Sequence, residues 1–300
     1  MHVLITGGSG FIGQALCPAL LEAGHELTVL TRNAERAAQS LPQDVALIER
    51  LDQAERADAV VNLAGEPLAD GRWTEKRKRE FRHSRLGTTK DLIQWIEDQP
   101  AAQRPRVLVS GSAIGYYGPR GDEKLDEAAP PGDDFAATLC RDWEHAAQAA
   151  EAFGLRVAIM RIGVVLGPGG GALAKMLPPF KLGAGGPMGD GQQWMSWVHR
   201  QDLASLILWL LENKHTHGPH NATAPEPVRN REFAKTLAHV LHRPALITTP
   251  ALALKLMFGE MSTLLLTGQR VVPAHATAGG FQFKYPELEA ALREVVAAQD

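Results

Sequence analysis

Short apolar runs alternate with longer amphipathic stretches along the first half of the chain. The runs at residues 3–5, 59–61 and 107–109 carry no alternating polar positions, which is typical of strands buried on both faces of a parallel sheet. Further strands are predicted at 26–31, 45–49 and 155–163, and helices at 14–23, 74–98 and 135–153. Strands with helices between them in this way predict an α/β fold with a doubly wound parallel sheet.

The pattern changes after residue 162. Residues 163–191 are rich in glycine and include four prolines, which favours loops that close over a cleft rather than regular structure. Beyond them, strands are predicted at 194–198 and 220–222, and helices at 201–212, 231–241, 251–258 and 288–297. These shorter elements predict a smaller C-terminal lobe folded against the carboxyl edge of the sheet.

A glycine-rich segment, TGGSGFIG at residues 6–13, directly follows the first strand. Gly7 suits a tight turn, Gly10 lets the backbone approach a phosphate, and Gly13 lets the next helix pack closely on the strand. The amides at the start of that helix point toward such a phosphate. A glycine turn without a nucleotide is the alternative, but the complete strand–helix–strand unit of roughly 30 residues favours dinucleotide binding.

The end of the second strand indicates which dinucleotide is bound. NAD-selective sites usually place Asp or Glu here to hold the ribose 2′-hydroxyl, whereas an arginine receives the 2′-phosphate of NADP. This chain has Thr31, Arg32 and Asn33 at that point and no acid. A solvated charge at the strand end is the alternative for Arg32. The sequence therefore predicts NADP(H) as the cofactor.

The composition narrows the kind of partner. The 300 residues are 45% hydrophobic and 22% charged, with a formal net charge of -3, so no general affinity for nucleic acid is expected. Cys17 and Cys140 have no ligand-type spacing, and neither a disulfide nor a metal site is predicted. No signal-peptide pattern or membrane-spanning apolar segment occurs. We expect a cytoplasmic protein that binds a small molecule rather than a membrane.

Four short segments follow one another along the chain: TGGSGFIG, NLAG at 62–65, SGSAIGYYG at 110–118 and RIGVVLGP at 161–168. Together they resemble the landmarks of extended short-chain dehydrogenase/reductases. The resemblance implies a Rossmann fold that binds NAD(P) across the strand ends. It also implies a substrate pocket formed by the C-terminal lobe.

The same resemblance divides the chain into two parts. Residues 1–162 would form the NADP-binding Rossmann domain, with 201–222 returning to it. Residues 163–200 and 223–300 would form the substrate-binding lobe. Within that lobe, 250–297, which includes GQRVVP and GFQFKYPELEAAL, resembles a C-terminal domain of unknown function.

The catalytic pair of that superfamily, a tyrosine and a lysine four residues apart, is absent. The chain has three tyrosines, Tyr116, Tyr117 and Tyr285, and no lysine stands four residues after any of them. Aligned on its later acid, the helix predicted to carry the pair has Ala136 in place of the tyrosine and Cys140 in place of the lysine. This departure resembles an atypical, epimerase-like subgroup.

Four residues are candidates for catalysis, each with a structural alternative. Ser112 is either an oxyanion-type donor to a substrate carbonyl or a hydroxyl that satisfies a strand-end amide. Cys140 is mostly neutral at its ordinary pKa and is expected to be a small buried spacer beside the nicotinamide ribose. Tyr117 is either a displaced acid or a packed aromatic. His199 titrates in the right range for a proton donor, or else holds its loop by hydrogen bonding.

The resemblance also implies a set of cofactor contacts, and no metal ligands. Arg85, at a position where the superfamily often has asparagine, could supply the missing positive charge or lie on a solvated helix face. Glu80 could face the cofactor or solvent. The complete set is Gly7, Gly10, Phe11, Ile12, Gly13, Thr31, Arg32, Leu63, Ala64, Gly65, Glu80, Arg85 and Val164.

Two functions are consistent with these features. The first is an NADP(H)-binding oxidoreductase or epimerase-like protein acting on an unidentified small polar substrate. The alternative is a non-enzymatic NADP(H) sensor or scaffold, which the missing Tyr-x-x-x-Lys pair favours. Because members of the superfamily often dimerise through two long helices, here around 74–98 and 135–153, a homodimer is also consistent with the resemblance.

Overall fold

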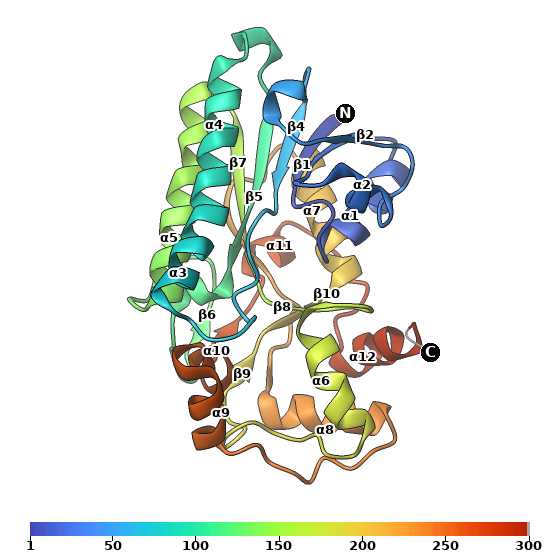
Figure 1. The fold of residues 1–300 in the computed structure, drawn as a ribbon, viewed down its shortest axis with the longest axis vertical. Coiled ribbons are helices and arrows are strands. Elements are labelled where there is room, and N and C mark those ends of the chain that lie inside the picture. The colour runs from blue at the N-terminus through green and yellow to red at the C-terminus, as the bar shows by residue number, and fades with distance from the viewer. Residues whose placement is uncertain (299–300) are drawn as a thin grey trace.

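The structure is a computed structural model that describes residues 1–298. A twisted seven-stranded parallel sheet forms the upper part of the molecule as drawn in Figure 1. The strand order is β3-β2-β1-β4-β5-β7-β11, and every neighbouring pair is parallel. The strands are β1 (His2–Thr6), β2 (Glu26–Leu30), β3 (Val45–Ile48), β4 (Ala59–Asn62), β5 (Val107–Ala113), β7 (Arg156–Ile162) and β11 (Gly218–Ala222). The predicted doubly wound sheet is confirmed, and the order reverses between β1 and β4, where such sheets bind ligands.

Helices cover both faces of the sheet (Figure 1). Val3 and Ile5 pack with α1 (Gly13–Glu22) and α7 (Arg200–Glu212) in one core. Leu4, on the opposite side of the same strand, packs in a second core with residues of the helices α4 (Thr88–Asp98) and α5 (Phe135–Gln148). The absence of polar alternation in the strands therefore has its expected cause, burial on both sides.

The long helix predicted at 74–98 is interrupted. It consists of α3 (Glu75–Arg82) and α4, joined by a π-helical turn at His83–Gly87. The Thr89 hydroxyl donates to the carbonyl of Arg85 at 2.7 Å within this wider turn. Such turns are frequent at functional sites because they displace a side chain from the regular helical register; here the turn carries Arg85.

The loop prediction for 163–191 was wrong in one stretch. Residues Gly171–Lys181 form helix α6, although it contains two prolines. The helix exists because Leu173, Leu177 and Phe180, spaced at helical intervals, are buried in the core of the lobe. Tertiary burial thus overrides the local preference of a glycine- and proline-rich segment.

The remaining elements form the lobe and its connections to the sheet. Two short strand pairs join 164–166 to 197–199 and 194–195 to 228–229, so the strand predicted at 194–198 is split. The elements are β8 (Val164–Leu166), β9 (Trp194–Met195), β10 (Trp197–His199), β12 (Val228–Arg229), α8 (Asn230–Val240), α9 (Ala251–Phe258), α10 (Thr263–Leu266) and α12 (Leu288–Ala297), with α2 (Ala34–Ala38), β6 (Lys124–Leu125), β13 (Arg270–Val271) and α11 (Ala274–Ala278) elsewhere.

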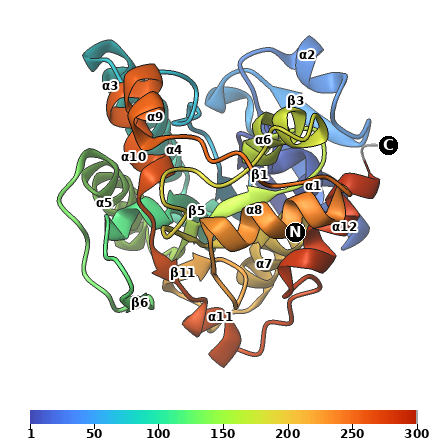
Figure 2. The same cartoon turned by 90° about the horizontal axis from the view of Figure 1, so that it is seen from below.

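The C-terminal segment joins the two parts of the molecule. Figure 2 shows α8 and α12 side by side beneath the sheet, with α9 and α10 beside α3. Strand β13 pairs with β6 of the sheet domain, and Lys78 of α3 pairs with Glu260 at 2.7 Å. Residues 299–300 of the predicted lobe lie outside the described residues. No helix within 1–298 is long and apolar enough to cross a membrane.

Candidate functional site

The glycine turn has the geometry that a dinucleotide phosphate requires. Gly7 has a φ of +72°, and a Cβ there would lie 2.7 Å from the backbone carbonyl of Leu63. A Cβ on Gly13 would lie 2.1 Å from the carbonyl oxygen of Gly8, so α1 packs directly on the turn. At Gly10 a Cβ would meet only the Gly7 carbonyl, at 3.1 Å, and the residue is exposed. The turn is therefore closed by backbone at Gly7 and Gly13 and open to solvent at Gly10.

The start of α1 presents backbone donors to this open side. The residue before the helix, Ile12, makes no side-chain capping bond. Among the described residues, none accepts a hydrogen bond from the backbone N–H of Phe11 or Ile12. Unpaired donors at a helix N-terminus bind anions. The chain thus fits the pyrophosphate of a dinucleotide at the predicted place.

Arg32 lies at the rim of the same edge. Its side chain is 94% exposed and forms one ion pair, at 3.0 Å, with Glu66 after β4. Thr31 and Asn33 bond to each other and set the strand end. Because an exposed ion pair contributes little, the Arg32 guanidinium is free to exchange Glu66 for a ligand phosphate.

The second side of the cleft is formed by β4, the π-helical turn and α5. Gly65 follows Leu63 and Ala64 at the end of β4, and a Cβ on Gly65 would lie 3.0 Å from Cζ of Arg85. The Arg85 guanidinium stacks over the Trp143 ring, with Cζ 5.3 Å from the ring centroid. Burial lowers the pKa of this guanidinium, while the nearby Cys140 and Glu66 act to raise it.

Arg85 lies near Cys140, the residue aligned with the missing lysine. Burial raises the pKa of the Cys140 thiol to about 11, so the thiol is neutral at physiological pH. No ion pair of Arg85 is found within residues 1–298. Arginine keeps its charge in proteins, and Arg85 is therefore a half-buried cation without a carboxylate partner. The solvated-face alternative does not fit this burial.

Ser112, at the end of β5, is 3% exposed. Its hydroxyl donates to Glu144 Oε1 at 2.6 Å. Arg161 of β7 holds the same carboxylate in a bidentate ion pair, with both N···O distances at 2.9 Å. Since the single hydroxyl proton points to Glu144, Ser112 is set to accept rather than to donate toward the cleft. The strand-end alternative is not what the structure has.

Tyr117 is fully buried. Its hydroxyl donates to Asn221 Oδ1 at 2.6 Å and accepts from Arg161 Nη1 at 3.0 Å. Burial raises the pKa of Tyr117 to about 12, against the opposing effect of Arg161. This environment favours the packed-aromatic alternative over a displaced acid.

His199 is also fully engaged. Its ring Nε2 lies 2.8 Å from Glu294 Oε2, and Nδ1 accepts from the backbone N–H of Gln201 at the start of α7. The ring packs against Tyr285 at an interplanar angle of 47°, with centroids 4.1 Å apart. Burial lowers the pKa of His199, although Glu294 opposes this. The structure places His199 as a helix cap, which favours the loop-holding alternative.

Two predicted cofactor residues have other partners. Glu80 forms an ion pair with Arg77 at 2.9 Å and is partly exposed on α3. Val164 begins β8, and its backbone N–H bonds to the Ser196 carbonyl at 2.8 Å. Neither partner belongs to the glycine turn, and the cofactor roles of both residues remain predictions from resemblance. No group of three or more possible metal ligands gathers within residues 1–298.

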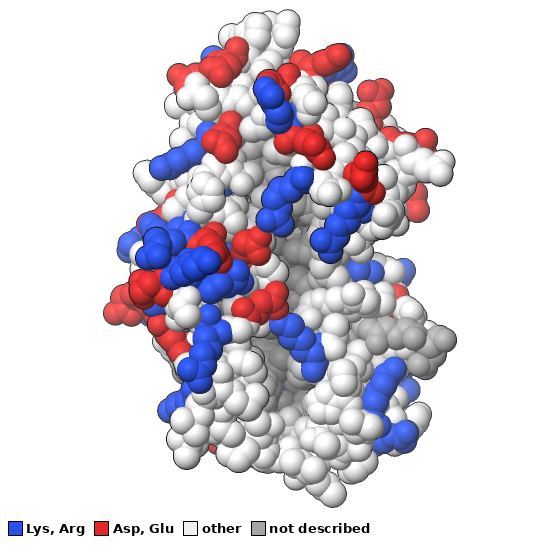
Figure 3. Space-filling view, viewed as in Figure 1, with Lys and Arg blue, Asp and Glu red and all other residues white. Residues whose placement is uncertain are grey.

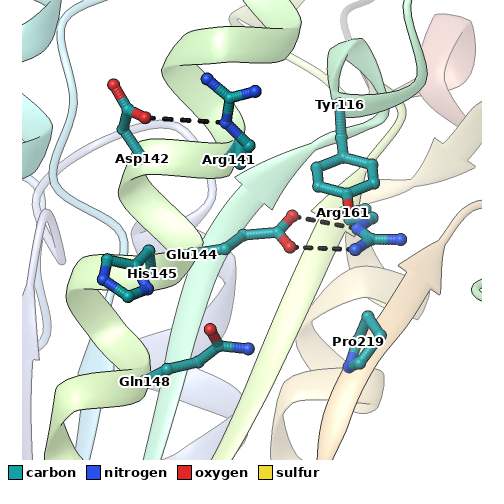
Figure 4. A pocket seen from close by; sticks show the side chains of 8 residues that line it. All are labelled: Tyr116, Arg141, Asp142, Glu144, His145, Gln148, Arg161 and Pro219. Carbon is teal, nitrogen blue, oxygen red and sulfur yellow. Dashed lines mark hydrogen bonds and ion pairs between the residues drawn. The ribbon is translucent and has the colours of Figure 1, made fainter. Parts of the chain in front are cut away.

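A pocket of about 400 Å³ lies between α5, β7 and β11. Figure 4 shows Glu144 and Arg161 pointing toward each other at its wall, with Tyr116 beside them. Cζ of Arg161 lies 3.5 Å from the Tyr116 ring centroid. None of the predicted cofactor residues lines this pocket. Glu144 therefore lies at the wall of a pocket that is open to solvent.

Comparison with known proteins identifies the family. The model of the NAD dependent epimerase/dehydratase family matches residues 3–222, most of the chain. The chain belongs to this family. A second model, of a domain of unknown function, matches residues 249–295 of this family member. The resemblance to an atypical epimerase-like group with that C-terminal domain is confirmed.

Named relatives extend over the full length. The chain is 44% identical to the "Epimerase family protein SDR39U1 homolog, chloroplastic" of Arabidopsis thaliana, over 99% of this chain and 87% of the relative. It is 39% identical to the "Epimerase family protein YfhF" of Bacillus subtilis, over 99% and 98%. A crystal structure of human epimerase family protein SDR39U1, isoform 2, with NADPH covers 99% of each chain at 39% identity, with a TM-score of 0.89.

Two residues that the sequence argument left out of the site belong near it. Glu144, the later acid of the helix predicted at 135–153, accepts a hydrogen bond from the Ser112 hydroxyl. Arg200 lies beside Phe11 of the glycine turn, 189 positions away in sequence. Its place two residues after the strand predicted at 194–198 was an available signal, because the carboxyl ends of strands carry the functional residues in this fold.

Proposed function

We propose that this family member binds NADP(H) and catalyses a hydride-transfer reaction on a small polar hydroxyl or carbonyl compound. The observation that supports this best is the half-buried, unpaired cation Arg85 beside Cys140, next to an open glycine cradle. An unpaired buried charge is costly, and a negative ligand group offsets that cost. The relative whose crystal structure contains NADPH supports the same cofactor.

The chemistry is divided among few groups. A bound nicotinamide supplies or accepts the hydride. In the oxidative direction, Ser112 accepts the proton of the substrate hydroxyl while its own proton passes to Glu144, which is 2.6 Å away. Glu144 then loses this proton to water in the pocket that it lines. Arg85 attracts the negative charge that develops on the substrate oxygen.

The test is a screen of small polar alcohols and carbonyl compounds in which turnover is monitored by NADPH fluorescence. We expect wild-type protein to turn over NADP(H) with at least one compound. Ser112→Ala is expected to reduce kcat by roughly 10²-fold, the scale of a lost general base, without changing the Kd for NADPH. Full activity of Ser112→Ala on that compound would contradict the role given to Ser112.

Arg32 is proposed to read the 2′-phosphate. Arg32→Ala is expected to weaken NADPH binding by about tenfold or more, since a hydrogen bond to a charged group contributes ~1.5 kcal/mol or more. NADH binding should not change. Arg36→Ala, which removes a neighbouring exposed arginine of α2, is the matched control. Equal affinities of wild-type protein for NADPH and NADH, measured by titration, would refute the preference.

A non-enzymatic NADP(H) sensor or scaffold remains the second candidate. It is favoured by the absence of the Tyr-x-x-x-Lys pair and by the burial of Tyr117, which cannot replace the missing tyrosine. The two candidates differ in the screen. A sensor would bind NADPH but would not oxidise it in the presence of any screened compound. The enzyme would consume NADPH in proportion to the product formed.

A further inference from the structure

Arg200 is the first residue of α7 and lies directly against the glycine turn. Its Cζ is 4.8 Å from the centroid of the Phe11 ring, and Nη1 is 3.5 Å from the Phe11 carbonyl oxygen. Helices α7 and α1 pack against each other on the same face of the sheet. The guanidinium therefore reaches the start of α1 from a neighbouring helix.

The charge of Arg200 has no ion-pair partner in the described part of the chain. Its Nε is buried and has no hydrogen-bond partner, and no ion pair of Arg200 occurs within residues 1–298. Glu294 is the carboxylate that influences it, but Glu294 is bonded to His199 at 2.8 Å. Burial lowers the pKa of Arg200. An anion beside this guanidinium would remove an electrostatic cost that the protein alone leaves in place.

Close packing fixes the guanidinium in this position. A Cβ on Gly167 would lie 2.8 Å from Cβ and 3.0 Å from Nε of Arg200. On Gly170 and Gly171, a Cβ would lie 2.5 and 2.7 Å from the Phe11 ring. The segment after β8 thus passes over both Arg200 and Phe11 only because it lacks side chains at these places. The Arg200 side chain is therefore held by packing against Gly167 and Phe11.

The cradle itself lacks a cation. Residues 6–13 contain no lysine or arginine, and a helix N-terminus supplies the equivalent of only about half a positive charge. The pyrophosphate of a dinucleotide carries two negative charges. Figure 3 shows lysine and arginine side chains at both sides of the hollow between the sheet domain and the lobe. A fixed arginine on α7 would supply the further positive charge needed to neutralise the pyrophosphate.

We propose that Arg200 is the pyrophosphate-binding cation of the cofactor site. This inference rests on the proposed function, because it assumes that a dinucleotide binds. It assigns the two ends of the ligand to different arginines. Arg200 binds the phosphates that NADPH and NADH share, and Arg32 reads the 2′-phosphate that only NADPH carries.

The test compares nucleotide affinities of Arg200→Gln and wild-type protein by fluorescence titration and calorimetry. We expect Arg200→Gln to weaken NADPH and NADH by similar factors of about tenfold or more. Adenosine 2′-monophosphate, which has the 2′-phosphate and no pyrophosphate, should bind both proteins equally. Arg293→Gln, which removes an exposed arginine of α12 paired with Glu289, should change none of these affinities.

Stability separates this role from a structural one. Removing an unpaired, partly buried cation should leave the midpoint of thermal unfolding of the ligand-free protein unchanged or higher. A structural arginine would lower it. If Arg200→Gln binds both dinucleotides as wild type does, or loses NADPH affinity alone, the inference is overturned while the proposed function stands. If wild-type protein binds no NADPH, the proposed function itself fails.

Discussion

Replacing Arg161 by methionine is expected to lower the free energy of unfolding by about 3–5 kcal/mol. The Arg161 side chain is 4% exposed and the Glu144 side chain 7%. Its guanidinium holds Glu144 through two hydrogen bonds and also donates to the Tyr117 hydroxyl. Without it, the buried carboxylate keeps, among the side chains of residues 1–298, only the Ser112 hydroxyl as a hydrogen-bond partner. The loss should be measured as a shift in urea-induced unfolding at neutral pH.

A second variant distinguishes a lost pair from general misfolding. The double variant Glu144→Gln with Arg161→Met removes both charges, so part of the lost stability should return. Arg293→Met, at an exposed pair on α12, should change stability by less than about 1 kcal/mol. If Arg161→Met alone were as stable as this control, the buried network would not contribute to folding.

The sheet was predictable because its signal is local. Runs such as 3–5 and 107–109 lack polar alternation since both faces are covered by helices, and that requirement appears in the sequence itself. The glycine turn was predictable for the same reason. Each of Gly7 and Gly13 touches backbone that would clash with any side chain, so the residue type records the geometry directly.

The hydrogen-bond network around Ser112 was less accessible, because its members come from distant segments of the chain. Ser112 was recognised, but its proton acceptor Glu144 lies 32 residues away and Arg161 a further 17. Only packing of α5 on β5 and β7 brings the three together. The burial of Tyr117 depends likewise on Asn221, 104 residues away. Spacing along the chain contains no record of such contacts.

Burial of apolar side chains can also overcome a low local helix propensity, and the sequence pattern did not reveal this. Helix α6 forms despite one glycine and two prolines because three apolar residues reach the core of the lobe. The π-helical turn at His83–Gly87 has no distinctive residue signal, since Gly87 alone is a common helix interruption. Yet that turn gives Arg85 its place beside the cleft.

Gly10→Ala is expected to weaken NADPH binding by about a hundredfold or more, ~2.7 kcal/mol, with little loss of stability. In the ligand-free protein a Cβ at this position would meet only the Gly7 carbonyl oxygen, at 3.1 Å. A shift of a few tenths of an ångström accommodates it. The added methyl group would, however, fill the space in which the backbone must approach the pyrophosphate. Calorimetric titration with NADPH and a urea unfolding curve measure the two effects separately.

Gly13→Ala provides the contrast, because its Cβ would lie 2.1 Å from the Gly8 carbonyl oxygen and would push α1 away from the turn. That variant should lose stability and binding together, whereas Gly10→Ala should lose binding alone. Wild-type NADPH affinity in a folded Gly10→Ala protein would mean that the phosphates lie elsewhere. Combined with Arg200→Gln, the Gly10→Ala loss should be less than additive, since both changes act on the same phosphate contacts.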